Sequence, residues 1–211
     1  MKRSYMGEMG RPPALSVSPR VETRRRKVLA GVRADGAPIL EYVLGTRGNI
    51  RAGRNVGAAG RRVGMDITWV TDRIAVGGGI WNEDNMAAVS RSGITHIIDM
   101  QIEFDDTVLA GPHGIMVCWN PVDDDFEPKP AEVFARGIEF ALAALKKNGA
   151  KVLVHCAAGV HRAPMMALAL LGVLGWSMED AMDLIETRRP AADFADVYVR
   201  SVENFLKQSQ R

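Results

Sequence analysis

The stretch that decides the fold is Val152-Leu-Val-His-Cys156-Ala-Ala-Gly-Val-His-Arg162-Ala-Pro164. Its first three apolar residues are typical of a short buried strand, and Pro164 opens an apolar segment with the character of a helix. Cys156 and Arg162 lie at opposite ends of the intervening loop, with five residues between them. The stretch therefore predicts a strand–loop–helix unit.

This loop is suited to a phosphate group. Its N–H groups can point inward as a nest, at the positive end of the helix that follows. The planar guanidinium of Arg162 can hold two phosphate oxygens, and the same field favours the thiolate of Cys156. We assign Cys156 and Arg162 as catalytic, and we expect the substrate to contact Ala157, Ala158, Gly159, Val160, His161 and Arg162. The alternative is a structural Cys and an unrelated surface Arg, but the strand before the loop and the helix after it favour phosphate binding.

The segment from His155 to Arg162 resembles the active-site loop of the cysteine-dependent protein phosphatases, above all the dual-specificity class. The similarity extends from about Asp66 to about Leu206. It implies a cysteinyl-phosphate intermediate and neither metal nor cofactor. A Ser or Thr usually follows the Arg and helps the thiolate to leave, whereas this chain has Ala163. The sequence Arg-Ala-Pro also resembles the plant glucan phosphatases.

A phosphoester that is attacked by a thiolate needs a proton donor for its leaving alkoxide. Three consecutive acids, Asp123, Asp124 and Asp125, follow a predicted strand that ends at Trp119. In parallel sheets such loops lie at the carboxyl ends of the strands, where ligands bind. The spacing to the next helix and to Cys156 favours Asp124 as general acid. Asp123 and Asp125 are the alternative candidates for the acid. The non-catalytic alternative is that the three acids form a solvated turn.

The charge distribution divides the chain into two parts. Residues 1–65 carry a net charge of +10 and residues 66–211 a net charge of −8, within a total of +2 over 211 residues. We expect residues 1–64 to be a basic, largely disordered N-terminal arm and residues 65–211 to be the catalytic domain. Within the arm, an Asp35-Gly36 turn between apolar runs can form a hairpin.

After Asp66, predicted strands alternate with predicted helices. The strands are 67–71, 74–76, 94–98, 115–119 and 152–154, and the helices are 83–92, 128–147, 165–174, 177–188 and 194–207. This alternation predicts an α/β fold with a central, mostly parallel twisted sheet of four to five strands flanked by helices, as in the phosphatases. Residues 99–114 read as a long polar connection.

Two cysteines, Cys118 and Cys156, are too few for a disulfide framework. A catalytic thiol needs a reducing compartment, so we expect a cytoplasmic protein, although the Arg-rich start also resembles an organelle transit segment.

No apolar run reaches the ~20 residues that span a bilayer. We expect a monomer. The arm has few aromatic residues to stack on bases, so nucleic acid is not an expected partner. A reversible disulfide between the two cysteines is an open alternative.

Several functions compete. The first is a protein phosphatase for phosphorylated Tyr, Ser and Thr, with a phosphoprotein as partner. A second is a phosphatase of a non-protein substrate such as phosphoglucan, an RNA 5′-triphosphate end or a small molecule. A third is a phospho-binding module without turnover. Rhodanese-like sulfur transfer uses a loop of different size, and arsenate reduction would need Cys118 as a resolving cysteine.

Overall fold

The computed structural model describes residues 25–32, 38–44 and 64–209. Its larger sheet has the strand order β3-β4-β7-β5-β6. The strands are β3 (Ile67–Trp69), β4 (Ile74–Gly77), β5 (His96–Asp99), β6 (Met116–Trp119) and β7 (Val152–His155). β4, β7, β5 and β6 run parallel, and β3 pairs antiparallel with β4. The prediction of a mostly parallel sheet of four to five strands is confirmed.

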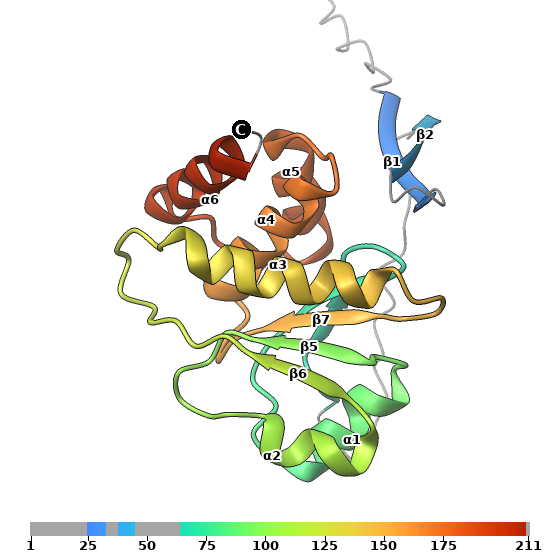
Figure 1. Ribbon diagram of the computed structural model, residues 1–211, viewed down its shortest axis with the longest axis vertical. Coiled ribbons are helices and arrows are strands. Elements are labelled where there is room, and N and C mark those ends of the chain that lie inside the picture. The colour runs from blue at the N-terminus through green and yellow to red at the C-terminus, as the bar shows by residue number, and fades with distance from the viewer. Residues whose placement is uncertain (1–24, 33–37, 45–63, 210–211) are drawn as a thin grey trace, which may run out of the picture.

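Helices cover both faces of this sheet (Figure 1). One face carries α1 (Glu83–Arg91) and α2 (Thr107–Ala110). The other face carries α3 (Ala131–Leu145), α4 (Arg162–Val173), α5 (Met178–Arg188) and α6 (Asp196–Ser209). The result is the three-layered α/β arrangement that alternating strands and helices produce.

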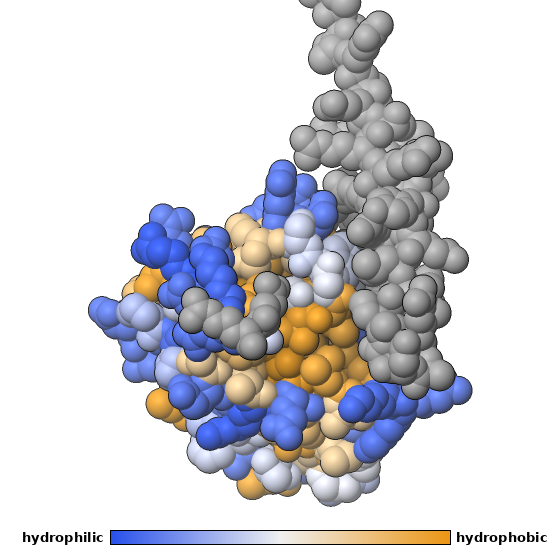
Figure 2. Space-filling model, turned by 45° about the horizontal axis from the view of Figure 1, so that its top comes forward, coloured by the Kyte–Doolittle hydropathy of each residue, from blue (hydrophilic) through white to orange (hydrophobic). Residues whose placement is uncertain are grey.

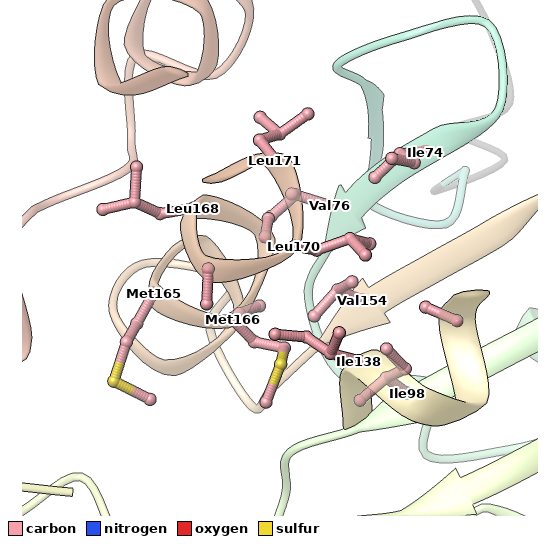
Figure 3. Packing of buried hydrophobic residues seen from close by; sticks show 14 of the residues in the cluster. Ile74, Val76, Ile98, Ile138, Val154, Met165, Met166, Leu168, Leu170 and Leu171 are labelled. Atoms are coloured by element: carbon pink, nitrogen blue, oxygen red, sulfur yellow. The ribbon is translucent and has the colours of Figure 1, made fainter. Parts of the chain in front are cut away.

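The two cores lie on opposite faces of the sheet because successive strand residues point in opposite directions. Val76, Ile98 and Val154 pack into the larger core, beneath α3 and α4. Their neighbours Ala75, Ile97 and Leu153 pack into the smaller core, toward α1. Figure 3 shows Leu170 and Met166 of α4 on the side of the strand residues of the larger core, whereas Met165 and Leu168 point to the other side of the helix. Burial on both faces explains why these strands are apolar throughout rather than alternating.

Two helices begin with a side-chain cap. Asn82 Oδ1 accepts a hydrogen bond from the Asn85 N–H at 2.9 Å at the start of α1. Ser177 Oγ accepts one from the Asp180 N–H at 3.0 Å at the start of α5. Each cap satisfies an amide that has no partner within its own helix.

Two boundaries differ from the sequence-based expectation. α4 begins at Arg162 and not after Pro164, so the Arg belongs to the first turn of the helix. Residues 99–114 are not a plain connection, because they include α2 and a 3₁₀ helix (Gly111–His113). These elements are too short to produce a readable 3.6-residue period, which is why the pattern did not reveal them.

In the N-terminal region, β1 (Arg25–Val32) and β2 (Pro38–Leu44) pair antiparallel, as expected for a hairpin, while the Asp35-Gly36 turn lies outside the described residues. Figure 2 shows one face of the molecule, on which hydrophilic side chains border a hydrophobic area. None of the helices within the described ranges has both the length and the apolar character needed to cross a bilayer.

Candidate active site

The nucleophile candidate follows the central strand of the sheet. β7 lies between β4 and β5, and Cys156 is the first residue beyond it. The Cys156 N–H donates to the Gly77 carbonyl at 3.4 Å, which extends the pairing of β7 with β4 by one residue. Cys156 is 1% exposed, so its thiol is enclosed by the surrounding loops. The expected place at the carboxyl ends of the parallel strands is the observed one.

The four carbonyls of residues 157–160 all bond to groups outside the loop. The carbonyl of Ala157 accepts from the Gly79 N–H at 3.0 Å, and that of Val160 accepts from the Asp193 N–H at 2.9 Å. Arg189 donates to the other two, at 2.7 Å to Gly159 and 3.4 Å to Ala158. In a trans peptide the N–H points opposite to the carbonyl, so the amides of this loop point inward. Consistent with this, the Gly159 N–H donates to Cys156 Sγ at 3.2 Å.

Gly159 is required at its position in the loop. Its φ is +67°, and an added Cβ would lie 2.6 Å from the Gly77 carbonyl oxygen and 2.2 Å from Arg189 Nη2. A side chain here would therefore displace both the neighbouring loop and the arginine that holds the carbonyls. Arg189, at the end of α5, is anchored in turn by Asp66, whose Oδ1 lies 2.9 Å from Nη1. The contacts of Arg189 therefore connect Asp66, at the start of the domain, to the active-site loop.

Arg162 is 3% exposed and is held along one edge of its guanidinium. Nη1 and Nη2 donate to Glu103 at 3.0 and 2.8 Å, and Nη1 also donates to the Val122 carbonyl at 3.1 Å. Nε is buried and makes no hydrogen bond within the described residues, although Asp124 Oδ2 lies 3.7 Å away. The edge formed by Nε and Nη2 is thus free to donate two hydrogen bonds to one anion.

Asp124 is the member of the acidic triplet that faces the loop. Its Oδ1 accepts from the Tyr198 hydroxyl at 3.0 Å, and its Oδ2 lies 3.1 Å from His161 Nδ1. Burial raises the pKa of Tyr198 to about 12, so the phenol stays a neutral donor. Asp125 pairs with Lys129, and Asp123 is exposed. The geometry favours Asp124, as the spacing did.

A buried polar cluster lies behind the nucleophile. His155, Asp99 and Asp106 are fully buried, and His155 Nε2 lies 2.8 Å from Asp106 Oδ2 and 3.6 Å from Asp99 Oδ1. Burial raises the pKa of Asp99 to about 6, although His155 and two backbone N–H groups act in the opposite direction. These three residues could hold a cation. However, 2.8 Å is shorter than the roughly 3.3 Å between neighbouring ligands on a tetrahedral ion with 2.0–2.1 Å bonds. We therefore interpret the cluster as a direct contact between imidazole and carboxylate that supports the loop.

Strand β5 lies between the strand that contains Cys118 and the strand that precedes Cys156. Cys118 on β6 is in register with Ile98 on β5, which is in register with Val154 on β7. Two strand spacings amount to roughly 10 Å, well beyond the ~7 Å Cα separation that a disulfide tolerates. Both thiols are free. This geometry does not favour the alternative of a reversible disulfide or a resolving role for Cys118.

The sequence comparison agrees with this geometry. Residues 80–208 match the family described as "Dual specificity phosphatase, catalytic domain". This chain belongs to that family. The match covers more than half of the sequence and contains the cysteine loop, Asp124 and all the helices of the larger core. Membership in the dual specificity phosphatases supports a phosphatase activity and confirms the resemblance seen in the loop.

Individual relatives are protein phosphatases of greater length. The chain is 32% identical over 136 residues to Protein phosphatase Slingshot homolog 3 of Rattus norvegicus, a match of 63% of this chain and 19% of that protein. It is 35% identical over 72 residues to Dual specificity protein phosphatase 5 of Homo sapiens, a match of 34% of this chain and 18% of that protein. The chain thus spans about a fifth of the length of these relatives.

Solved structures share the fold at lower identity. A structure of PTPMT1 in complex with PI(5)P has a TM-score of 0.60 at 20% identity, covering 68% of this chain and 96% of that one. Kinase associated phosphatase, with its catalytic site cysteine substituted by serine, has a TM-score of 0.58 at 19% identity, covering 70% and 97%. These values confirm the dual specificity phosphatase fold, and they carry no information on the substrate.

The structure brings the predicted site residues of this phosphatase domain together. Cys156, Arg162 and the loop between them adjoin Asp124, as the sequence predicted, while their roles in catalysis stay predictions. Sequence reasoning did not find Glu103, Arg189 or Tyr198, whose partners lie 59, 30 and 74 positions away in the chain. No local pattern carries such long-range contacts. For Arg189, a charge just before Pro190 at the end of a helix was the only local signal.

Proposed function

We propose that this chain hydrolyses phosphomonoesters through a cysteinyl-phosphate on Cys156, with phosphorylated Tyr, Ser and Thr residues of proteins as substrates. The observation that carries the proposal is the orientation of the loop. Its carbonyls are bonded outward, its Gly159 N–H is directed at Cys156 Sγ, and one edge of Arg162 is free. Together these groups supply donors around the place where three phosphoryl oxygens would lie.

The reaction would proceed in two displacements. The thiolate of Cys156 attacks phosphorus and forms the S–P bond, while the P–O ester bond breaks and the leaving oxygen takes a proton from Asp124. Water then attacks phosphorus, Asp124 takes its proton, the S–P bond breaks and the thiolate returns. The loop amides and Arg162 hold the phosphoryl oxygens in both steps. No proton is gained or lost by the protein over a full turnover.

The protein class of substrate is supported by two observations. The relatives named above are protein phosphatases. The residues between Cys156 and Arg162 are Ala, Ala, Gly, Val and His, so the loop contains no Lys or Arg of its own. A substrate with several phosphate groups would be expected to need such additional cations. A single phosphate on a protein side chain needs only the nest and Arg162.

The test is hydrolysis of para-nitrophenyl phosphate in the presence of EDTA. The wild-type chain should turn the ester over, and Cys156→Ser should lower kcat to below a few per cent while inorganic phosphate still binds. Cys118→Ser is the matched control, because it removes the other thiol two strands away and should leave kcat unchanged. Activity retained in Cys156→Ser would exclude Cys156 as the nucleophile.

A substrate panel separates the competing functions. Phosphotyrosine and phosphoserine peptides, phosphoglucan and RNA with a 5′-triphosphate end should be assayed side by side with the wild-type chain. The proposal expects the highest kcat/KM on a phosphopeptide. A preference for phosphoglucan or RNA would assign the site to a non-protein substrate. Binding of phosphopeptides with no turnover of any substrate would assign a phospho-binding module.

A further inference from the structure

The candidate acid Asp124 is surrounded by donors. Tyr198 contacts Oδ1 at 3.0 Å, while His161 Nδ1 at 3.1 Å and Arg162 Nε at 3.7 Å contact Oδ2. A general acid must have a proton available at the start of each turnover, and a neighbour that can hold this proton and return it would keep it in the site. Arg162 cannot be deprotonated in a protein, and Tyr198 holds its proton firmly because burial raises its pKa to about 12. His161 is therefore the neighbour that can both hold a proton and give it away.

The second ring nitrogen of His161 connects it to solvent. Nε2 lies 3.4 Å from Asp193 Oδ2, and the side chain of Asp193 is 66% exposed, whereas that of His161 is 20% exposed. An imidazole with a carboxylate at each nitrogen can donate to both only in its protonated form. Two constraints hold the ring in this position. The Asp193 N–H donates to the Val160 carbonyl at 2.9 Å, and Phe126 packs edge-on against the ring at 5.0 Å.

We propose that His161 and Asp124 form a single proton-donating unit, in which His161 stores the proton between turnovers and Asp193 orients its ring. This inference rests on the proposed function. It goes beyond it by giving His161, which the sequence assigned only to the lining of the site, a role in proton transfer. Three groups with ionisable or fixed charge face this pair of His161 and Asp124: Asp193, Arg162 and Tyr198.

The proton follows a closed path. As the ester bond breaks, the proton on His161 Nδ1 moves to Asp124 Oδ2 across 3.1 Å, and Asp124 gives a proton to the leaving oxygen. His161 is then neutral and Asp124 is a carboxylate. In the second step Asp124 takes the proton of the attacking water and passes it to Nδ1, which restores the imidazolium. Asp193 keeps its contact with Nε2 throughout, so the ring does not rotate.

The first experiment compares the variant His161→Asn with the wild type on two leaving groups. The Asn amide can still donate to Asp124 but cannot titrate. On a phosphoserine peptide, whose alkoxide needs a proton, kcat should fall by roughly 10–100-fold. On para-nitrophenyl phosphate, whose leaving group needs little protonation, kcat should fall less. The alkaline limb of kcat/KM should move to lower pH, because a carboxyl alone would then have to carry the proton.

A matched control is available on the other face of the sheet. His113 Nε2 lies 3.3 Å from Glu83 Oε2, so this pair also joins a histidine to a carboxylate. His113→Asn should change neither kcat nor the pH limb. If His161→Asn lowers kcat equally on both substrates and leaves the limb in place, His161 acts only through packing, and the proposal is overturned.

The second experiment does not depend on turnover. The ring signal of His161 is followed by NMR as pH is raised, in the wild-type chain and in Asp124→Asn. The midpoint should fall when the Asp124 carboxylate is removed, because a neighbouring negative charge favours the protonated imidazole. An unchanged midpoint overturns the proton-donating unit, even where the phosphatase activity is confirmed. A shifted midpoint in a chain that hydrolyses no phosphoester supports the pair and contradicts the proposed function.

Discussion

Glu103 holds Arg162 by both terminal nitrogens, at distances of 2.8 and 3.0 Å. The contact uses the end of the guanidinium fork and leaves the edge that includes Nε free of hydrogen bonds among the described residues. Glu103 and a bound phosphate would therefore occupy different edges of the same cation. A bidentate partner at one edge fixes the plane of the guanidinium and so directs the other.

The first prediction follows from these separate edges. Glu103→Ala should weaken competitive inhibition by inorganic phosphate about tenfold, because Arg162 loses the partner that orients it. If Glu103 instead competed with phosphate, the variant would bind phosphate more tightly, and the orienting role would be wrong. Asp105→Ala is the control, since Asp105 lies in the same connection and bonds to Thr107. The measurement is the inhibition constant for phosphate with para-nitrophenyl phosphate as substrate.

The second prediction identifies the acid. Asp124→Asn should lower kcat on a phosphoserine peptide by roughly 10²–10⁴-fold, and should have less effect on an activated aryl phosphate. Asp123→Asn and Asp125→Asn are matched controls from the same triplet, because Asp123 is exposed and Asp125 pairs with Lys129. The comparison needs kcat for all three variants on both substrates. If Asp123→Asn or Asp125→Asn shows this loss of kcat while Asp124→Asn stays active, the general acid is that other residue.

The third prediction concerns the residue after Arg162. Ala163 is fully buried in the same cluster as Cys156 and has no hydroxyl to offer to the departing thiolate. Breakdown of the phosphoenzyme should then limit turnover, and the wild-type chain should show a burst in stopped-flow hydrolysis of para-nitrophenyl phosphate. Ala163→Ser should raise kcat and reduce the burst. The same rate in both proteins without a burst would show that the hydroxyl is dispensable here.

The fourth prediction uses the buried carboxyl behind the loop. Burial raises the pKa of Asp99 to about 6, above the value of about 3.9 for an unfolded chain. Between these values the folded protein binds more protons than the unfolded chain, so the contribution of Asp99 to stability is complete below about pH 4 and is lost as pH rises through 6.

In Asp99→Asn this loss should be absent. Between pH 4 and pH 7 the free energy of unfolding of the wild type should fall relative to the variant, by up to roughly 3 kcal/mol. Urea denaturation of both proteins across this range measures the difference. Asp105→Asn, a change at a partly exposed residue of the same connection, serves as control. If the free energy of unfolding depends on pH in the same way in the wild type and in Asp99→Asn, the pKa of Asp99 is not raised.

The fifth prediction concerns the boundary of the domain. Residues 65–211 expressed alone should have a thermal midpoint and a kcat/KM on para-nitrophenyl phosphate close to those of the full chain. A fragment of residues 80–211, which keeps the family match, should be less stable, because it loses β3, β4 and the contact of Asp66 with Arg189. If the longer fragment also melts several degrees lower, the N-terminal region contributes to the fold.

The sequence predicted the parts of this molecule that depend on neighbours in the chain. The strand, loop and helix around Cys156 are local, and so are the caps at Asn82 and Ser177. Even the choice of Asp124 within its triplet rested on spacing. Glu103 and Arg189 were not found, because their function depends on partners that only the folded chain brings near. α2 is a single turn, which no periodic pattern can reveal.

The burial of α4 and β7 has a consequence for how this domain loses activity. The loop between them is joined to the central strand and to a helix whose residues 162–171 are all buried. Amide hydrogens in β7 and α4 should therefore exchange with solvent only when the whole domain opens. The segment of residues 123–128 is more exposed and should open far more often. On heating, the acid-bearing loop should become mobile first, whereas the strand and helix that flank the cysteine loop should keep their structure up to the temperature of global unfolding.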